Sequence, residues 1–76
     1  MRHSKFYFND IYLGTLYENG VFKYKIASSQ AKDIDIESTV HILERIRQIG
    51  LTADFNYDNY VSSYNNSYFK DGFKFK

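Results

Sequence analysis

Few side chains of this 76-residue chain are of a type and spacing that could support chemistry. Its two histidines are His3, close to the N-terminus, and His41, four residues after Glu37. A spacing of four would place Glu37 and His41 on one face of a helix, as two potential ligands of a metal ion. No third ligand follows at a suitable spacing, so the pair is interpreted as a surface contact, and no metal or cofactor is expected.

An acidic run of Asp33, Asp35 and Glu37 could supply the paired carboxylates of general acid–base catalysis. That chemistry requires one carboxyl to be desolvated, with its pKa raised. Here the run precedes an apolar helical pattern, where N-capping and the helix dipole already account for acidic residues. The chain has no cysteine, which excludes a thiolate nucleophile, a thiolate metal site and a disulfide. The sequence therefore predicts a protein that is not an enzyme.

Aromatic and basic residues are the more distinctive set. Eight tyrosines and seven phenylalanines make up 20% of the chain, and its formal net charge is only +1. Each aromatic side chain can bury about 150–250 Å², so the rings exceed what one small core needs, and some are expected at the surface. The near-zero charge excludes a broadly basic nucleic-acid coat and a polyanion mimic.

Two groups of these residues are candidate binding surfaces for protein or nucleic acid. The first consists of Tyr7, Tyr12, Leu16, Lys23 and Lys25. The second consists of Tyr60, Tyr64, Tyr68 and Lys70. Aromatics with flanking lysines on a sheet are typical of single-strand nucleic-acid modules, whereas Tyr with Asn and Ser is typical of protein-binding surfaces. The structural alternatives are a solvated sheet face with stabilising tyrosine pairs for the first group, and core packing for the second.

The N-terminal third predicts three antiparallel strands over residues 5–8, 11–17 and 21–27. Asn9-Asp10 and Asn19-Gly20 separate them, and the second is expected to be a two-residue type I′ loop. In that register the core-facing residues are Phe6, Phe8, Ile11, Leu13, Thr15, Tyr17, Phe22, Tyr24 and Ile26. The opposite face carries Lys5, Tyr7, Tyr12, Gly14, Leu16, Lys23 and Lys25. Gly14 has no turn role and indicates a bulge or the close approach of another backbone.

The remainder predicts one main helix over residues 36–49, with Asp33 or Asp35 as N-cap and Gly50 after its end. Residues 51–57 are expected to form a strand and residues 73–76 a closing strand. For residues 58–70 a second helix and short strands around turns are both left open. The tyrosines recur at helical spacing, but the residues between them are poor helix formers. The fold class expected is α+β: one domain, residues 1–76, with a small, mainly antiparallel sheet of four or five strands and the 36–49 helix on one face.

Two resemblances to known families follow from short segments. Leu16-Tyr17-Glu18-Asn19-Gly20 with Lys23 and Lys25, then Asp33, Asp35 and Glu37-Ser38-Thr39 at a helix start, resemble a small anti-CRISPR family over about half of the chain. That family implies a small sheet packed by helices and binding to the type I-F CRISPR surveillance complex. Tyr12-Leu13-Gly14-Thr15-Leu16 resembles a hairpin in the N-terminal subdomain of HipA-type kinases. Neither resemblance transfers functional residues.

The function expected is a small non-enzymatic protein-binding module, namely a phage or mobile-element inhibitor that sterically blocks a CRISPR-type host defence protein or nucleoprotein complex. The alternative is a small nucleic-acid-binding module that uses the aromatic and basic sheet face. A homodimer through a sheet edge, such as residues 5–8 or 73–76, is a further possibility. No apolar run approaches the about 20 residues that span a membrane, and no signal-peptide pattern is visible. The location expected is cytoplasmic, which would be the host cytoplasm for a phage product.

Overall fold

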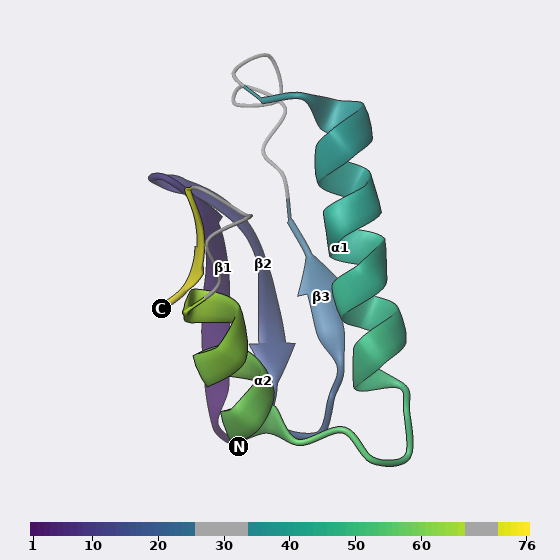
Figure 1. Ribbon diagram of the computed structural model, residues 1–76. Coiled ribbons are helices and arrows are strands. Elements are labelled where there is room, and N and C mark those ends of the chain that lie inside the picture. The colour runs from purple at the N-terminus through teal and green to yellow at the C-terminus, as the bar shows by residue number, and fades with distance from the viewer. Residues whose placement is uncertain (26–33, 67–71) are drawn as a thin grey trace.

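The computed structural model describes residues 1–25, 34–66 and 72–76. Their elements in chain order are β1 (His3–Phe8), β2 (Ile11–Tyr17), β3 (Phe22–Tyr24), α1 (Ile36–Gly50), α2 (Tyr57–Asn65) and β4 (Phe73–Phe75). The strands form one antiparallel four-stranded sheet in the order β3-β2-β1-β4 (Figure 1). The predicted α+β class and the N-terminal meander are therefore confirmed.

The turn between β2 and β3 has three residues, and this sets the register of the hairpin. The N–H of Tyr17 donates to the carbonyl oxygen of Val21 at 2.8 Å, which leaves Glu18, Asn19 and Gly20 in the loop. Gly20 has a φ of +94°, as expected of the left-handed residue that ends a three-residue hairpin loop. The prediction of a two-residue loop is therefore wrong by one residue.

This longer loop exchanges the faces on which neighbouring β2 side chains lie. Leu16, rather than Tyr17, is opposite Phe22. Leu16 and Phe22 are both buried in the core, and Leu16 has no exposed surface. The prediction that Leu16 belongs to an exposed binding face is wrong, and so is the placement of Tyr17 on the core face.

A β-bulge between β1 and β2 shifts the register by one residue, so the two ends of β2 follow different alternation patterns. Tyr7 is opposite Tyr12, but Phe6 is opposite Gly14, so Leu13 is the extra residue of the bulge. Leu13 is fully buried as well. The bulge therefore lets Tyr12 stay on the far side of the sheet from the core while Leu13 and Leu16 both enter it.

Gly14 lies where the backbone of β3 and the ring of Phe22 both approach β2 closely. A Cβ atom at Gly14 would lie 2.6 Å from the carbonyl oxygen of Lys23 and 2.9 Å from Cζ of Phe22. The bulge and the close backbone approach that Gly14 indicates in the sequence are both present. Gly14 and Thr15 exchange faces relative to the prediction, since Gly14 is under Phe22 and the Thr15 hydroxyl hydrogen-bonds the Tyr12 hydroxyl.

The helix α1 begins and ends close to its predicted bounds. Asp35 is the N-cap, and its side chain accepts a hydrogen bond from the N–H of Ser38 at 3.3 Å. Gly50 is the last helical residue, and a Cβ there would lie 1.9 Å from the carbonyl oxygen of Gly20. Two glycines thus let the end of α1 touch the β2–β3 turn directly.

The segment after α1 differs from the prediction of a strand over residues 51–57. Residues 51–56 are a connection without regular structure, because Leu51 and Thr52 cap the end of α1 through bonds to the carbonyl oxygens of Gln48 and Ile49. Asn56 then caps α2, since its side-chain oxygen accepts from the N–H of Asn59 at 3.0 Å. Of the two alternatives left open for residues 58–70, a helix is present up to Asn65, and residues 67–70 lie outside the described residues.

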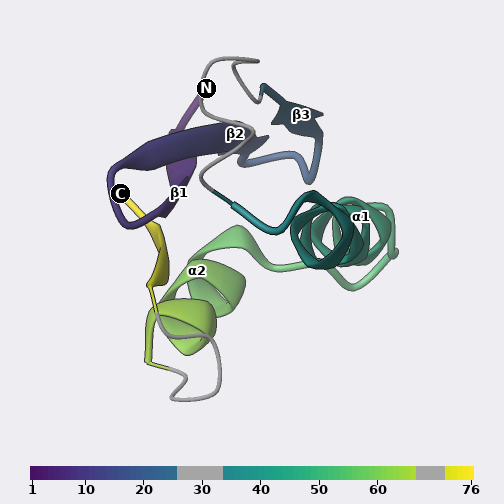
Figure 2. The ribbon, with the colours of Figure 1, turned by 90° about the horizontal axis from the view of Figure 1, so that it is seen from above.

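Both helices lie on the same side of the sheet (Figure 2), so the core is a single layer between them and one sheet face. Its buried apolar residues are Phe6, Leu13, Leu16, Phe22, Leu43, Ile46 and Phe75. The predicted packing of a helix on one face is confirmed, with α2 as a second helix on that face. The other face is covered by neither helix.

Of the two segments predicted as possible dimer edges, residues 73–76 include an edge strand of the sheet and residues 5–8 do not. β1, which contains residues 5–8, pairs on both sides and is a central strand. β4 is an edge strand, but the Asn65 side-chain amide bonds both backbone groups of Phe75, at 3.0 and 2.9 Å. Asn65 therefore occupies the position of a further strand beside β4.

Replacing Gly14 by alanine is expected to lower the free energy of unfolding by about 1–3 kcal/mol, because the added methyl group meets backbone that cannot rotate away. Urea unfolding followed by circular dichroism measures this. Ser63→Ala, at an exposed α2 position, is the control and should change stability by less than about 0.5 kcal/mol. A Gly14→Ala protein as stable as its parent would contradict the close approach of β2 and β3.

Candidate functional site

The sheet face that neither helix covers carries a concentrated set of basic and aromatic side chains. By strand alternation and register its described residues are His3, Lys5, Tyr7, Tyr12, Thr15, Tyr17, Lys23, Lys25, Lys74 and Lys76. We call this set the outer face. The tyrosines lie on the two central strands, whereas four of its five lysines lie on or just after the edge strands β3 and β4.

Each tyrosine of the outer face has a lysine ammonium group near its ring. Lys5 Nζ lies 6.0 Å from the ring centroid of Tyr12. Lys76 Nζ lies 5.2 Å from that of Tyr7, and Lys23 Nζ lies 5.6 Å from that of Tyr17. These are cation–π distances, so rings and ammonium groups form three adjacent pairs on one surface.

The aromatic residues of the outer face form two pairs. Tyr7 and Tyr12 have ring centroids 5.7 Å apart, and His3 and Tyr17 have ring centroids 5.8 Å apart. His3 and Tyr7 are four residues apart on β1, so the two pairs are separated by about 13 Å along the strands. The hydrogen bond between the hydroxyls of Tyr12 and Thr15 holds the Tyr12 ring along β2.

A row of lysines crosses the sheet between the two aromatic pairs. Lys5 is opposite Thr15 on β2, and Thr15 is opposite Lys23 on β3. On the other side, Lys5 and Lys76 exchange backbone hydrogen bonds of 2.9 and 2.7 Å. The row Lys76, Lys5, Thr15 and Lys23 therefore runs perpendicular to the strands.

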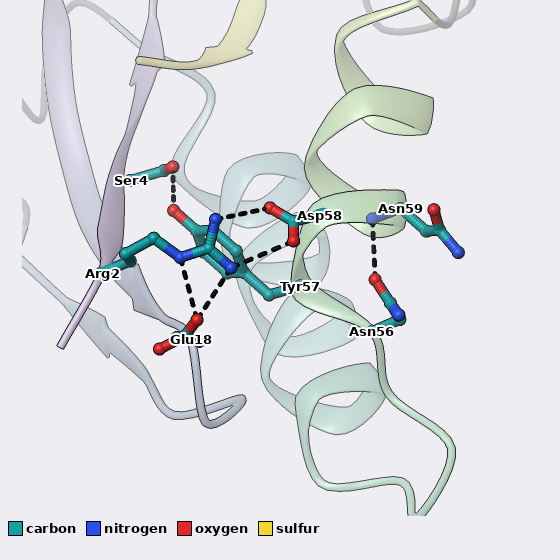
Figure 3. A network of polar contacts seen from close by, with 7 residues as sticks. All are labelled: Arg2, Ser4, Glu18, Asn56, Tyr57, Asp58 and Asn59. Carbon is teal, nitrogen blue, oxygen red and sulfur yellow. Dashed lines mark hydrogen bonds and ion pairs between the residues drawn. The ribbon is translucent and has the colours of Figure 1, made fainter.

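The charge of Arg2, which lies toward α2, is neutralised within the protein (Figure 3). The Arg2 guanidinium donates to Glu18 at 2.8 Å and to both carboxylate oxygens of Asp58 at 2.9 and 3.0 Å. These hydrogen bonds from Arg2 hold the pKa of the Asp58 carboxyl below its usual range. The guanidinium also lies over the Tyr57 ring, whose hydroxyl bonds Ser4, so Arg2 ties the N-terminus to α2.

The outer-face lysines make no ion pair with any carboxylate in residues 1–25, 34–66 and 72–76. The acidic residues in this part of the chain are in turns, in connections or on helices: Asp10, Glu18, Asp35, Glu37, Glu44, Asp54 and Asp58. Five positive charges thus share one face, and Asp10, which lines a surface hollow with Lys74 and Lys76, makes no ion pair with either of them. The face has a positive potential although the whole chain is nearly neutral.

The first candidate group from the sequence is largely brought together on this face. Tyr7, Tyr12, Lys23 and Lys25 lie on it, and only Leu16 is lost to the core. Sequence reasoning placed Lys5 on this face without naming it as a binding residue, and it did not place His3, Tyr17, Lys74 or Lys76 there. Tyr17 was missed because the β2–β3 loop was predicted one residue too short. Lys74 and Lys76 were missed because the alternation of residues 73–76 does not reveal which strand they pair with.

The second candidate group does not form a projecting surface. Tyr64 packs edge-on against Phe6 and Phe75, with ring centroids 5.4 and 5.3 Å apart. Tyr60 packs against Phe55 and Phe75. Burial raises the pKa of Tyr60 to about 12 and raises that of Tyr64 as well. Both tyrosines thus help cover the core, while Tyr68 and Lys70 lie outside the described residues.

Other kinds of site find little support in the described part of the chain. No group of three or more His, Asp or Glu side chains there could hold a metal ion. No helix in the same residues is long and apolar enough to cross a membrane. Comparisons of the chain with protein families, with curated proteins and with solved structures found no match. The outer face is therefore the candidate functional site.

The assignment of Tyr60 and Tyr64 to the core can be tested by alkaline unfolding. Because burial raises their pKa values above the ordinary value of 10.0, the stability gained from keeping them neutral is fully present below about pH 10. It is lost as the pH rises through about 12, the folded pKa of Tyr60. We expect Tyr64→Phe to unfold at a higher pH than the parent, measured by circular dichroism.

The Tyr64 variant should also be at least as stable as the parent at neutral pH, because its hydroxyl is buried with no hydrogen-bond partner among the described residues. Tyr57→Phe is the matched control, since it removes a hydroxyl that bonds Ser4 and should lower the neutral-pH stability. An unchanged alkaline midpoint for Tyr64→Phe would mean that this residue does not belong to the core.

Proposed function

We propose that the protein is a non-enzymatic binding module and that its outer face binds nucleic acid. The observation that carries this proposal is the segregation of charge. Five lysines without a carboxylate partner among the described residues share one sheet face, in a chain whose net charge is only +1. A ligand with regularly spaced negative charges is the one that such a face attracts most strongly.

The tyrosines distinguish nucleic acid from other anionic ligands. Lysines bind phosphates and release counterions, which supplies affinity without regard to sequence. Aromatic rings on the same surface add base stacking, which a ligand made only of phosphates or carboxylates does not use. The outer face offers both kinds of contact within 5.2–6.0 Å of each other.

The second candidate is the blocking function predicted from the sequence, now restricted to the outer face and to an acidic target. The tyrosine content of the outer face favours it, since tyrosine is common at protein-binding surfaces. Its five lysines would then require an acidic target surface. For an inhibitor of a CRISPR-type defence protein, the outer face is a better candidate surface than Tyr60 and Tyr64, because those two residues pack against the core. A cytoplasmic location, in the host cell for a phage product, suits either ligand.

Binding of a fluorescein-labelled 20-nucleotide DNA, measured by anisotropy at about 50 mM salt, tests the proposal. Affinity should fall with salt, with a log–log slope of up to about −3.5 if all five lysines each neutralise one phosphate of a single strand. Lys5→Ala and Lys23→Ala should each weaken binding and make the slope shallower by about 0.7.

Arg45→Ala is the matched control, because it removes a positive charge from the exposed surface of α1 rather than from the outer face. It should leave affinity and salt slope close to those of the parent. The proposal would be contradicted by an absence of binding to both single- and double-stranded DNA, or by an Arg45→Ala defect as large as that of Lys5→Ala.

A further inference from the structure

We infer that the nucleic acid bound by the outer face is single-stranded, and that its unstacked bases lie on two aromatic positions, Tyr7–Tyr12 and His3–Tyr17. This inference rests on the proposed function and makes it more specific. It draws on three features of the face: where the rings lie, how far apart the two pairs are, and what covers the rings in the free protein.

The first feature is the central position of the rings. Tyr7, Tyr12, Tyr17 and His3 lie on β1 and β2, the two inner strands, and lysines lie to either side of them. A duplex presents phosphates to a sheet face and keeps its bases stacked inside, so it would contact the lysines and leave the rings unused. A single strand can place its phosphates on the lysines and turn its bases onto the rings.

The second feature is the distance between the aromatic pairs. The separation of about 13 Å corresponds to about four steps of a stacked strand at 3.4 Å per nucleotide, and to fewer steps of an unstacked one. The row formed by Lys76, Lys5 and Lys23 lies between the pairs. A strand of about four or five nucleotides can therefore reach both aromatic positions while its backbone crosses the lysine row.

The third feature is the ammonium group that lies near each tyrosine ring. Lys76, Lys5 and Lys23 lie 5.2–6.0 Å from the rings of Tyr7, Tyr12 and Tyr17 respectively. A base that stacks on a ring face must displace the ammonium group from that face. The displaced lysine then becomes available to a phosphate of the same nucleotide strand. Each lysine and tyrosine pair thus forms one nucleotide-binding unit in which both contacts change together.

The experiment compares four probes at one salt concentration: deoxythymidine oligomers of two to twelve nucleotides, a twelve-base-pair duplex, an abasic oligomer and inorganic polyphosphate. Affinity for the oligomers should rise steeply up to about five nucleotides and slowly beyond that length. The duplex, the abasic oligomer and polyphosphate of matched charge should each bind at least about tenfold more weakly, since stacking on a protein ring is worth about that much per base.

Variants assign the stacking to the outer face. Tyr7→Leu should weaken binding of a six-nucleotide oligomer by about 5- to 100-fold, and Tyr7→Phe, which keeps the ring, should not. Tyr24→Leu removes a tyrosine from the core side of the sheet and is the matched control. In a double-mutant cycle, Tyr12→Leu and Lys5→Ala should be non-additive, because they act on one unit.

The outcomes separate this inference from the proposed function. Equal binding of duplex, polyphosphate and oligomer, still dependent on Lys5 and Lys23, would overturn the single-strand inference and leave nucleic-acid binding in place. Equal binding of the abasic and the complete oligomer would overturn it as well, even if Tyr7→Leu failed to fold. No binding of any probe would overturn both.

Discussion

The one-residue bulge at Leu13 decides which side chains of β2 enter the core and which reach the outer face. Without it, strict alternation along β2 would place Tyr12 and Leu16 on the same side, and either an aromatic ring would be buried or a core leucine exposed. With it, Leu13 and Leu16 are both fully buried, and Tyr12 stays opposite Tyr7. Gly14, next to the bulge, lets β3 lie close to β2, because a Cβ atom there would lie 2.6 Å from the carbonyl oxygen of Lys23 and 2.9 Å from Cζ of Phe22. The core and the outer face therefore both depend on the Leu13-Gly14 segment.

A chain of this size has few ways to build a core, and here it relies on rings packed on a single sheet face. Phe6 is the centre of that arrangement, with aromatic contacts to Phe22, Tyr64, Phe73 and Phe75 that come from three other strands or helices. Both helices are used on that one side. The opposite face is thus left to side chains that tolerate water. Tyrosine and lysine suit it, because a phenol ring and a lysine stem pack on the sheet while the hydroxyl and ammonium groups stay solvated.

The net charge of the chain conceals how its charges are arranged. Lysines gather on the outer face, while the acidic residues of the described chain lie in turns, in connections and on the helices, and two of them neutralise Arg2. An almost neutral composition argues against a broadly basic protein, but it does not argue against a basic face. The sequence first suggested a surface that blocks a protein. The basic face favours a surface that binds nucleic acid instead. The loss of Tyr60 and Tyr64 to the core acts in the same direction, because those rings formed much of the second candidate surface.

Local patterns in the sequence determined much of this protein: the meander, the main helix with an aspartate N-cap, the closing strand and the placement of Tyr7 and Tyr12 on the face away from the core. These features follow from turn residues, capping residues and side-chain periodicity, all of which act within a few residues. The register of β2 and β3 was beyond such reasoning, since Asn19-Gly20 suits both a two- and a three-residue loop, and burial of Leu16 chooses between them. The choice of a helix for residues 57–65 and the pairing of β4 with β1 also required tertiary contacts, among them the Asn65 amide on Phe75. Lys74 and Lys76 therefore join the outer face through long-range packing, which no local pattern encodes.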